Sequence, residues 1–539
     1  MWGGLRPIPS RLALDIATIV SLTFCAFTEP NHFNHVLLGL AAFGTVTTAG
    51  LTHRWTISFP LVPFLVLQTL RRLDLGPVWI TVVIGTLSTL LILLSTALSI
   101  LFPAVELQPV KGKYNVGIID LHLPVDFSES KRRGSLLGTQ HQDEITARIL
   151  YPTDEEPEDL PYLDPESAPL LCDELMKAGA PGPLKSLGWM LHTWRLTHIR
   201  AKRNAQPSNH LDQFPLAVYS HGLTGIAAIY SYQALNLAAS GTVVLMVDHT
   251  DRSAVATRRR DSTHLLYDPR PVTDIYMNGK EVEYVRKRRA QTQHRVEECL
   301  SALSCLKSLN RRNIPDLASV GVKFVGKLDT ADVTLMGHSF GGCTVLSAAA
   351  QRPDLISAVV AHEPAIDWMP DAARRALFSA DRMEQLETPY SGGTGGYEDS
   401  KGKNEEKKDD CQSAVAGDFS SAQASIHDIN MLYLYSDEWA QLGWGAFSLI
   451  KSMHAHGALG PKQGTTDVGV VQKAKHQEFS DSCMLTPIWL ARATGLTGER
   501  NPHETAAEIG ARTLEFLEAT RKQRKERGRG NQSRSNTWS

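Results

Sequence analysis

The chain has 539 residues, of which 42% are hydrophobic and 21% charged, and its 10 Trp, 13 Tyr and 16 Phe suffice for a large core. This composition excludes a chain that is disordered as a whole. Because 55 Lys and Arg nearly balance 57 Asp and Glu, the net charge is −2, which excludes a dedicated nucleic-acid binder with a basic face. The seven Cys form no C-x-x-C pair, so the sequence predicts neither a structural zinc site nor a dense disulfide framework.

The first 105 residues carry nearly all of the strongly apolar sequence. Residues 78–102 include no charged side chain. A helix of that length measures about 37 Å, since each residue adds about 1.5 Å, and a bilayer core is about 30 Å thick. Shorter apolar stretches precede it at 12–28, 36–51 and 55–70. We therefore predict an α-helical membrane region over residues 1–105, with three or four transmembrane helices, and a multi-pass membrane protein.

The side of the membrane on which the remaining chain lies depends on the number of these helices. With four, Arg71 and Arg72 fall on the side opposite the other flanking basic residues, and the positive-inside rule places the C-terminal part in the cytoplasm. With three, Arg54, Arg71 and Arg72 lie inside and the C-terminal part faces outward. The sequence leaves both orientations open.

From Lys111 onward, short apolar runs alternate with helical stretches. The predicted strands are residues 115–124, 144–151, 215–220, 242–248, 333–336, 358–362 and 431–435. The predicted helices include residues 230–239, 282–309, 343–351, 439–453 and 503–521. Continuous apolar strands separated by helices predict an α/β domain over residues 111–520, with a mostly parallel sheet and helices on both faces.

Two segments of this part do not follow the alternation. Residues 392–421 contain GGTGG and EEKKDD with few large apolar side chains, which predicts a disordered surface insertion. Residues 521–539 begin with a strongly basic run. We predict a disordered, solvated tail there, which could also contact anionic lipid head groups at a cytoplasmic membrane surface.

The motif with the clearest chemistry is Gly337-His338-Ser339-Phe340-Gly341, a G-x-S-x-G sequence. An apolar strand candidate precedes it, and a helix of small residues follows it. This is the strand–turn–helix context of a nucleophile elbow, in which glycines allow a strained turn to expose the Ser hydroxyl. The pattern predicts Ser339 as a catalytic nucleophile.

A Ser hydroxyl needs a base to take its proton, and a carboxylate to orient that base. In hydrolases with a G-x-S-x-G elbow, the acid and then the His follow the Ser along the chain. His476 is therefore the preferred base, because it lies beyond the last predicted strand. Three residues could supply the carboxylate. Glu363 directly follows the strand after the elbow, Asp367 lies four residues further on, and Asp437 follows the next strand.

An oxyanion hole requires backbone N–H groups directed at the developing negative charge. The stretch from Ser220 to Gly225, SHGLTG, follows a predicted strand and opens a helix, which suits a loop that supplies one N–H group. The N–H of Phe340, directly after the nucleophile, supplies the second.

Four motifs in this order resemble the platelet-activating factor acetylhydrolases of the plasma and cytosolic serine-dependent group, in the α/β-hydrolase superfamily. They are His221-Gly222-Leu223, Asp248-His249-Thr250-Asp251-Arg252-Ser253-Ala254, Gly337-His338-Ser339-Phe340-Gly341-Gly342 and His476-Gln477-Glu478-Phe479-Ser480-Asp481. The resemblance extends roughly from Lys111 to Thr494. It implies Ser339 as nucleophile, His476 as base, and Leu223 and Phe340 as oxyanion donors.

The acid is where this sequence departs from the family. The family acid lies on the strand after the elbow in an Asp-Ala-Trp-Met setting, whereas this chain reads HEPAIDWM from His362 to Met369. Glu363 matches the position at the strand end, and Asp367 matches the Trp-Met context. We favour Glu363.

We predict a serine esterase that is anchored to a membrane by its apolar N-terminal region, which is not part of the family pattern. The resemblance implies that this esterase removes a short or oxidised sn-2 acyl group from a phospholipid. It implies no calcium, and we expect no cofactor and no catalytic metal. Two alternatives are a general carboxylesterase or dienelactone-hydrolase-like enzyme on small soluble esters, and a catalytically inactive hydrolase fold used as a membrane scaffold. The presence of both Ser339 and His476 argues against the scaffold.

Overall fold

The computed structural model describes residues 78–102, 107–124, 144–179, 194–312, 315–378, 425–461 and 464–535, with a few single residues between them. The chain divides into two compact units. One comprises the described parts of residues 1–110, 156–203 and 480–504. The other comprises those of residues 111–155, 204–479 and 505–539, and it contains every predicted site residue.

The first unit consists of helices and one strand pair. Its helices are α4 (Val78–Leu101), α6 (Ala168–Gly179), α15 (Ser482–Leu485) and α16 (Ile488–Ala493). Strand β3 (Glu158–Pro161) pairs antiparallel with β4 (His198–Arg203). The end of α4 packs on α16, where the rings of Phe102 and Trp489 meet edge to face with centroids 5.7 Å apart.

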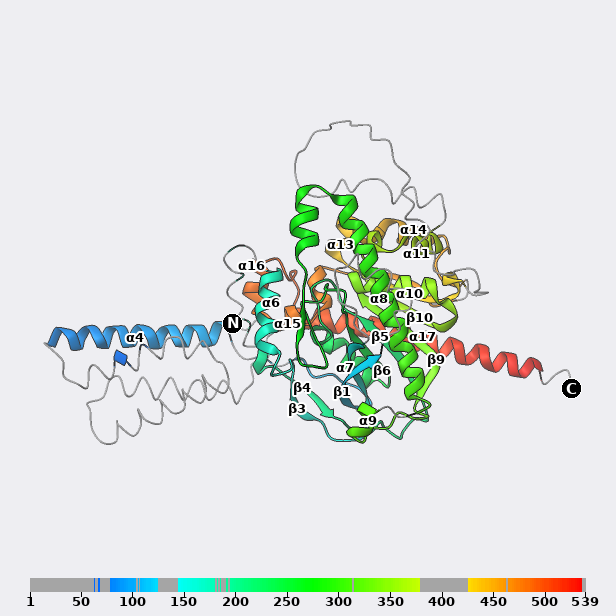
Figure 1. Ribbon diagram of the computed structural model, residues 1–539, viewed down its shortest axis with the longest axis horizontal. Helices are drawn as coiled ribbons and strands as arrows, with labels where there is room; N and C mark the ends of the chain where they lie inside the picture. Colours follow the sequence, from blue (N-terminus) through cyan, green and yellow to red (C-terminus); the bar gives the residue numbers. More distant parts are fainter. Residues whose placement is uncertain are drawn as a thin grey trace, which may run out of the picture. The chain divides into compact units, whose positions relative to one another are not determined.

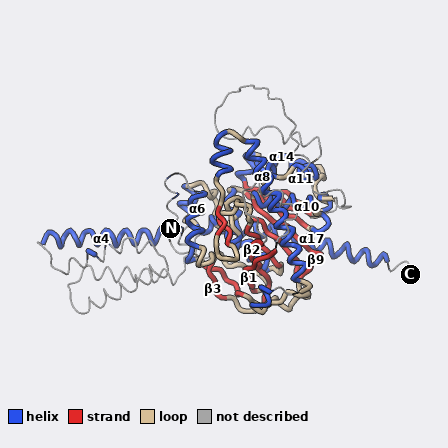
Figure 2. The backbone as a smooth tube through the Cα atoms, viewed as in Figure 1, coloured by secondary structure: helices blue, strands red, loops and turns tan. Residues whose placement is uncertain are grey.

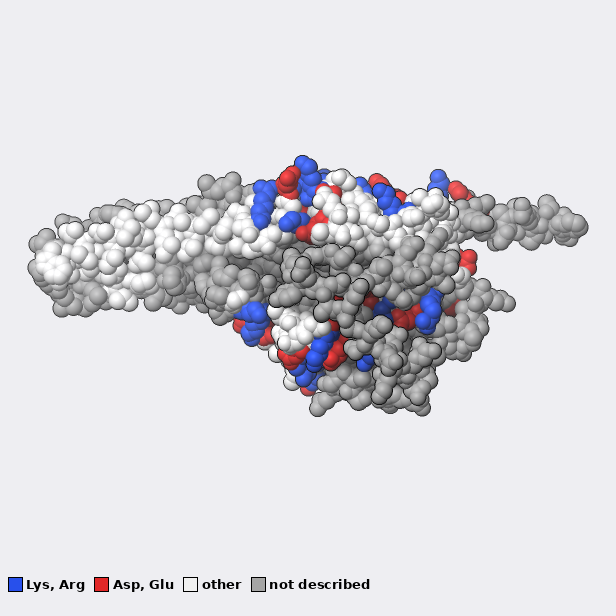
Figure 3. All heavy atoms as spheres, turned by 90° about the horizontal axis from the view of Figure 1, so that it is seen from above, with Lys and Arg blue, Asp and Glu red and all other residues white. Residues whose placement is uncertain are grey.

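The long apolar stretch before the globular part forms α4, a helix of 24 residues without acidic or basic side chains. Figure 3 shows it as a white rod at the left, and many of its large apolar side chains are exposed. Counted over the described residues, no helix combines the length and the apolarity that a membrane span requires. The predicted spans at 12–28, 36–51 and 55–70 lie outside the described residues, apart from single positions.

The second unit is built on a sheet in the order β12-β11-β10-β9-β5-β6-β2-β1. Figure 1 labels β10, β9, β5, β6 and β1 of this sheet. Neighbours from β12 to β6 are parallel, and β2 and β1 continue the sheet antiparallel. The strands are β1 (Asn115–Pro124), β2 (Glu144–Thr153), β5 (Phe214–Ser220), β6 (Val243–Asp248), β9 (Leu328–His338), β10 (Ala358–His362), β11 (Asn430–Ser436) and β12 (Asp467–Val471). A separate hairpin joins β7 (Ala256–Arg258) to β8 (His264–Leu266).

Helices cover this sheet, as Figure 2 shows in blue against the red strands. They are α7 (Ser231–Ala239), α8 (Glu281–Leu309), α9 (Pro315–Ser319), α10 (Phe340–Gln351), α11 (Asp371–Leu377), α13 (Asp437–Leu442), α14 (Phe447–Ala455) and α17 (Pro502–Ser535). Because side chains alternate along a strand, β11 shows the two faces. Tyr433 and Tyr435 join the core that contains α8 and α10, whereas Leu434 packs with Ile509 of α17. Helices therefore lie on both faces, as predicted.

The chain has an α/β-hydrolase fold, and each of the seven predicted strands overlaps an observed one. The prediction of a single helix over residues 439–453 is wrong, because Gly443 and Gly445 adopt φ of +70° and +63° and separate α13 from α14. Residues 156–203 and 480–504, assigned from sequence to the catalytic domain, group with the first unit instead.

The C-terminal segment also differs from its prediction. Helix α17 continues to Ser535, so residues 521–535 are helical where a disordered tail was expected. The Arg, Lys, Gln and Glu of this stretch are good helix formers, and they extend a helix whose first turns are already held by burial. The predicted insertion at 392–421 lies outside the described residues.

Candidate active site

Ser339 stands at the sharp turn between β9 and α10, with φ +56° and ψ −114°. Its N–H donates to the carbonyl of His362 at 2.8 Å, which fixes the turn against β10. The glycines around it leave no room for a side chain. A Cβ at Gly337 would collide with the backbone of Gly341, and one at Gly341 with the carbonyl of Ser220. The motif therefore forms the strained elbow that its sequence predicts.

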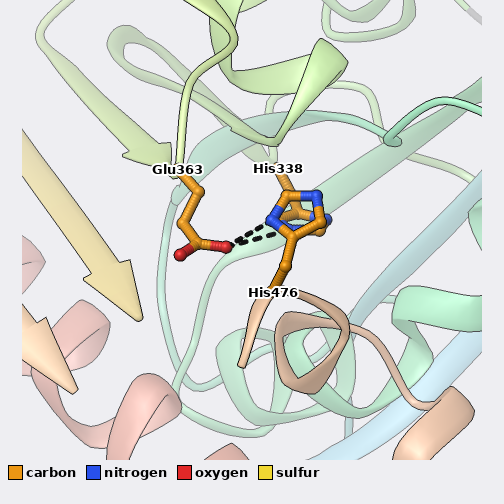
Figure 4. A group of neighbouring side chains, drawn as sticks. All are labelled: His338, Glu363 and His476. Atoms are coloured by element: carbon orange, nitrogen blue, oxygen red, sulfur yellow. Dashed lines mark hydrogen bonds and ion pairs between the residues drawn. The ribbon is translucent and has the colours of Figure 1, made fainter. Parts of the chain in front are cut away.

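Ser339, His476 and Glu363 form a continuous hydrogen-bonded relay. Nε2 of His476 lies 3.1 Å from Oγ of Ser339, and Nδ1 lies 2.5 Å from Oε2 of Glu363. Figure 4 shows the Glu363 carboxylate directed at the His476 ring, with the His338 ring beside it. Ser339 is 8% exposed, so its hydroxyl is nearly enclosed. The three residues come from the ends of β9 and β10 and from the segment after β12, and only the fold brings them together.

Glu363 occupies a fully buried position directly after β10, with φ of +45°. Its second oxygen, Oε1, accepts the backbone N–H of Ser436 at 2.6 Å, so both oxygens have donors. Burial alone would raise the pKa of this carboxyl. The charge and hydrogen bond of His476, together with His338, outweigh burial and lower the pKa to about 2. Glu363 is thus an anion held in a fixed orientation, as the acid of a triad must be.

His338, the residue before the nucleophile, also faces Glu363. The hydroxyl of Tyr230 accepts the N–H of Gly222 at 3.1 Å and lies 3.0 Å from Nδ1 of His338. This hydroxyl can donate its hydrogen to Nδ1, and the Glu363 carboxylate on the other side of the ring can only accept, so both neighbours favour the tautomer of His338 with its proton on Nε2. That nitrogen lies 3.8 Å from Oε2 of Glu363. Burial and the neighbouring His476 lower the pKa of His338 to about 4, so this ring is neutral while it faces the carboxylate.

The His476 ring is held by its neighbours as well as by its hydrogen bonds. Trp439 of α13 stacks on it, with ring centroids 4.4 Å apart and planes 5° from parallel. The backbone N–H of His476 donates to Oε2 of Glu438 at 3.1 Å. This packing restricts the imidazole to the orientation in which its two nitrogens face Ser339 and Glu363.

The other two carboxylates considered from sequence make no contact with His476 among the described residues. Asp437 begins α13, and its Oδ2 accepts the N–H of Lys473 at 3.4 Å. Asp367 lies in a short helix after β10, where burial raises the pKa of its carboxyl. The structure therefore places Glu363, and neither of these two, beside the imidazole.

The two predicted oxyanion donors belong to the loop after β5 and to the first turn of α10. Leu223 follows β5 in a loop whose neighbouring N–H groups are both engaged, that of Gly222 by Tyr230 and that of Thr224 by the carbonyl of Ser253. Phe340 is the first residue of α10. Among the described residues, no acceptor binds the N–H of Leu223 or of Phe340. Both remain available for a ligand oxygen.

Sequence reasoning did not identify four residues that shape this site: His338, Tyr230, Trp439 and Ser436. His338 lies inside the G-x-S-x-G motif, and its polar character was the one local signal. Tyr230 and Trp439 stand in helices where an aromatic residue indicates core packing. Ser436 contributes a backbone N–H, which no side-chain pattern reveals.

His338, Glu363 and His476 also place three potential metal-ligand atoms within 4.8 Å of one another. The hydrogen bonds fit a proton relay better than a metal centre. A metal on His476 Nδ1 would displace the proton that Glu363 accepts, and the tautomer of His338 that its neighbours favour has a proton on Nε2 in place of a free lone pair.

The buried histidines of this site predict acid-sensitive stability. Burial lowers the pKa of His362 to about 3 and contributes to the value of about 4 at His338, both below the ordinary 6.5. The unfolded chain then binds more protons than the folded one below pH 6.5, so stability should fall as the pH drops from 6.5 towards 3. The low pKa of Glu363 adds to this loss below pH 4.5.

The variant His362→Gln removes one of these titrations. We expect its free energy of unfolding to depend less steeply on pH between 3 and 6.5, by up to about 1.4 kcal/mol per pH unit. Denaturant unfolding at a series of pH values measures both slopes. A wild-type stability that is flat over this range, or equal slopes for the two proteins, would contradict the prediction.

Comparison with known proteins places this geometry in a family context. The family model described as "Platelet-activating factor acetylhydrolase, isoform II" matches residues 99–370, which include Ser339 and Glu363 but end before His476. A platelet-activating factor acetylhydrolase of Cavia porcellus is 33% identical over 163 residues, which are 28% of this chain and 35% of that protein. A putative phospholipase A2 of Schizosaccharomyces pombe is 28% identical over 272 residues, 44% of this chain and 58% of that protein.

The chain thus spans between about a third and three fifths of the length of these curated relatives. Among solved structures, a ferulic acid esterase from Streptomyces cinnamoneus aligns with 77% of this chain and 92% of its own, at 15% identity and a TM-score of 0.46.

Proposed function

The chain belongs to the platelet-activating factor acetylhydrolase family, and from this premise we propose that it is a serine-dependent carboxylic ester hydrolase acting on a phospholipid. The observation that carries the proposal is the relay from Ser339 through His476 to the buried Glu363 at a nucleophile elbow. Its arrangement suits acyl transfer, because a nucleophile, a base and an orienting anion lie within hydrogen-bonding reach of one another.

In the first half-reaction, His476 Nε2 takes the proton of Ser339 as Oγ attacks the ester carbonyl. Glu363 stabilises the resulting imidazolium through Nδ1–H and remains ionised. The N–H groups of Leu223 and Phe340 bind the oxyanion of the tetrahedral intermediate. When that intermediate collapses, His476 returns the proton to the departing alcohol oxygen, which leaves an acyl group on Ser339.

In the second half-reaction, His476 takes a proton from a water molecule that attacks the acyl-enzyme. The same two N–H groups bind the second oxyanion, and the proton returns to Oγ of Ser339 as the carboxylic acid departs.

For the substrate, we propose a glycerophospholipid with a short or oxidised sn-2 acyl group, of the 1-alkyl-2-acetylglycerophosphocholine type, hydrolysed without calcium. Family membership and the relatives named as acetylhydrolase and phospholipase A2 support this choice. The test is a panel of phosphatidylcholines that differ in sn-2 chain length, with p-nitrophenyl acetate as a soluble ester, assayed with and without a calcium chelator. Hydrolysis of the soluble ester alone would favour the general carboxylesterase alternative, and no hydrolysis of any ester would contradict the proposal.

Membrane attachment through residues 1–105 is the finer part of the proposal. The support is the uncharged sequence from 78 to 102 and the exposed apolar side chains of α4, including Trp79, Val82 and Leu93. Exposure of such an apolar surface to water is unfavourable in free energy, whereas the hydrocarbon core of a bilayer accommodates it. We propose a multi-pass membrane protein. By the positive-inside rule, three and four transmembrane helices place the catalytic unit on opposite sides of the membrane.

Removing residues 1–105 tests this attachment. The full chain should stay with the membrane pellet after an alkaline carbonate wash, and the truncated chain should appear in the supernatant. The truncated chain should still hydrolyse p-nitrophenyl acetate at a rate within about threefold of the detergent-solubilised full chain, because Ser339, Glu363 and His476 all lie in the second unit. A full chain released by carbonate would contradict membrane anchoring. A folded but inactive truncation would show that the apolar region is needed for catalysis.

A further inference from the structure

A buried arginine in the middle of α8, Arg295, takes no part in the mechanism described above. It is fully buried, and its Nε donates to Oδ2 of Asp251 at 3.0 Å and to Oγ of Ser253 at 3.0 Å. Asp251 is also buried, so the two charges compensate each other away from water. Removing two charges from water costs about as much free energy as their mutual attraction returns. A buried pair of this kind is therefore weak evidence that Arg295 serves only to stabilise the fold.

The same guanidinium binds the loop that carries the first oxyanion donor. Nη1 of Arg295 donates to the carbonyl of His221 at 2.7 Å, two residues before Leu223. Nη2 donates to Oγ of Ser253, and the carbonyl of Ser253 in turn accepts the N–H of Thr224 at 2.8 Å. Arg295 therefore holds the chain just before Leu223 directly, and the chain just after it through Ser253.

The residue that carries the second oxyanion donor, Phe340, also contacts this guanidinium. The Cζ atom of Arg295 stands 4.1 Å from the centre of the Phe340 ring, which is within the range of a cation–π contact. Phe340 is fully buried, and its backbone supplies the N–H next to the nucleophile. One planar side chain thus contacts both elements that must present an N–H to the same oxygen.

We propose that Arg295 is a positioning residue that sets the spacing of the two oxyanion donors, Leu223 and Phe340. The inference rests on the function proposed above. An oxyanion hole works by preorganisation, and donors displaced by about 1 Å can lose on the order of 100-fold in rate. A guanidinium suits this task, because it is rigid and planar and donates in several fixed directions.

The variant Arg295→Lys tests the proposal in the full chain. Lys keeps the positive charge beside Asp251, but a single ammonium group cannot also reach the His221 carbonyl and offer a flat face to Phe340. We expect kcat and kcat/KM for p-nitrophenyl acetate to fall together by about 10- to 100-fold, which is the signature of an interaction made in the transition state.

Inhibitor binding separates positioning from general damage. A phenylboronic acid forms a tetrahedral anion on the nucleophile and needs both donors, so its Ki should rise by about the same factor as kcat/KM falls. The matched control is Arg288→Lys, on the same face of α8. Arg288 is equally buried and stands 6.0 Å from the Phe340 ring centre, and its Nη1 binds Gln291. Arg288→Lys should keep kcat/KM and the boronate Ki within about threefold of wild type.

Thermal unfolding of each variant shows whether it is folded at the assay temperature. If Arg295→Lys does not fold, Ser253→Ala provides the second test. It keeps both buried charges but removes the hydroxyl that accepts from Nε and Nη2. We expect this variant to lower kcat/KM and to weaken boronate binding by about three- to tenfold, with KM little changed.

The outcomes separate this inference from the proposed function. A folded wild-type chain that hydrolyses no ester and binds no boronate overturns the proposed function itself. If the wild type is active, three results would each overturn the role of Arg295. They are unchanged kinetics in folded Arg295→Lys, or in Ser253→Ala where Arg295→Lys does not fold; an equal loss in Arg288→Lys; and a loss of activity without weaker boronate binding.

Discussion

Replacing Ser339 by alanine should remove essentially all esterase activity and leave the fold intact. Oγ of Ser339 is the atom placed 3.1 Å from Nε2 of His476, and an alanine methyl group cannot attack a carbonyl. Loss of the nucleophile of a triad typically lowers kcat by about 10⁴- to 10⁶-fold. The measurement is kcat on a soluble ester, together with labelling of the active-site serine by a fluorophosphonate.

Ser347 provides a matched control, since it is a buried serine on α10 whose hydroxyl donates to the carbonyl of Cys343 at 2.7 Å. Ser347→Ala should retain both activity and labelling. Activity of Ser339→Ala within tenfold of wild type, or persistent labelling of that variant, would refute the assignment of the nucleophile.

Replacing Glu363 by glutamine should lower kcat by up to about 10⁴-fold, the loss known for the equivalent change in a Ser-His-Asp triad. The neighbours of Glu363 explain why an isosteric change is so damaging. Oε1 accepts the N–H of Ser436, so a glutamine would keep its carbonyl oxygen there and turn its amide NH₂ towards His476. Two donors would then face each other, and the imidazole would have to move its proton to Nε2, where it could no longer accept from Ser339.

The variants Asp367→Asn and Asp437→Asn serve as controls on the same soluble ester, and both should stay within about threefold of wild type. Neither carboxylate contacts His476 among the described residues, and Oδ2 of Asp437 instead accepts a hydrogen bond from the N–H of Lys473. A loss in either variant larger than that in Glu363→Gln would move the acid to that residue.

The sequence alone was informative wherever chemistry is encoded locally. The elbow at Ser339 follows from residues adjacent in the chain, because glycines 337 and 341 are required by contacts that any folded form of this turn makes. The predicted strands of the parallel part of the sheet were recognisable because strands buried on both faces read as continuous apolar runs. Chain order pointed to His476, and the position at a strand end pointed to Glu363. These two residues lie 113 positions apart, yet their atoms lie 2.5 Å apart.

Features that depend on distant contacts were not predictable from the sequence. Strands β3, β4 and β12 are short or partly exposed, and their apolar periodicity is too weak to distinguish them from loops. The assignment of residues 156–203 and 480–504 to a separate unit depends on packing between segments far apart in the chain.

The sequence favoured Glu363 among three carboxylates, but only the tertiary structure shows which of them lies beside His476. Glu363, Asp367 and Asp437 all follow strands of one parallel sheet, whose carboxyl ends meet at the same edge, so each was a reasonable partner for His476. What distinguishes Glu363 is the Ser436 N–H from the neighbouring strand and the stack of Trp439 on the imidazole. The contacts of Arg295 with His221, Ser253 and the Phe340 ring depend likewise on the packing of α8 against segments far from it in the sequence. Hydrogen bonds and ring contacts of this kind act over a few ångströms in space and leave no periodic trace in the sequence.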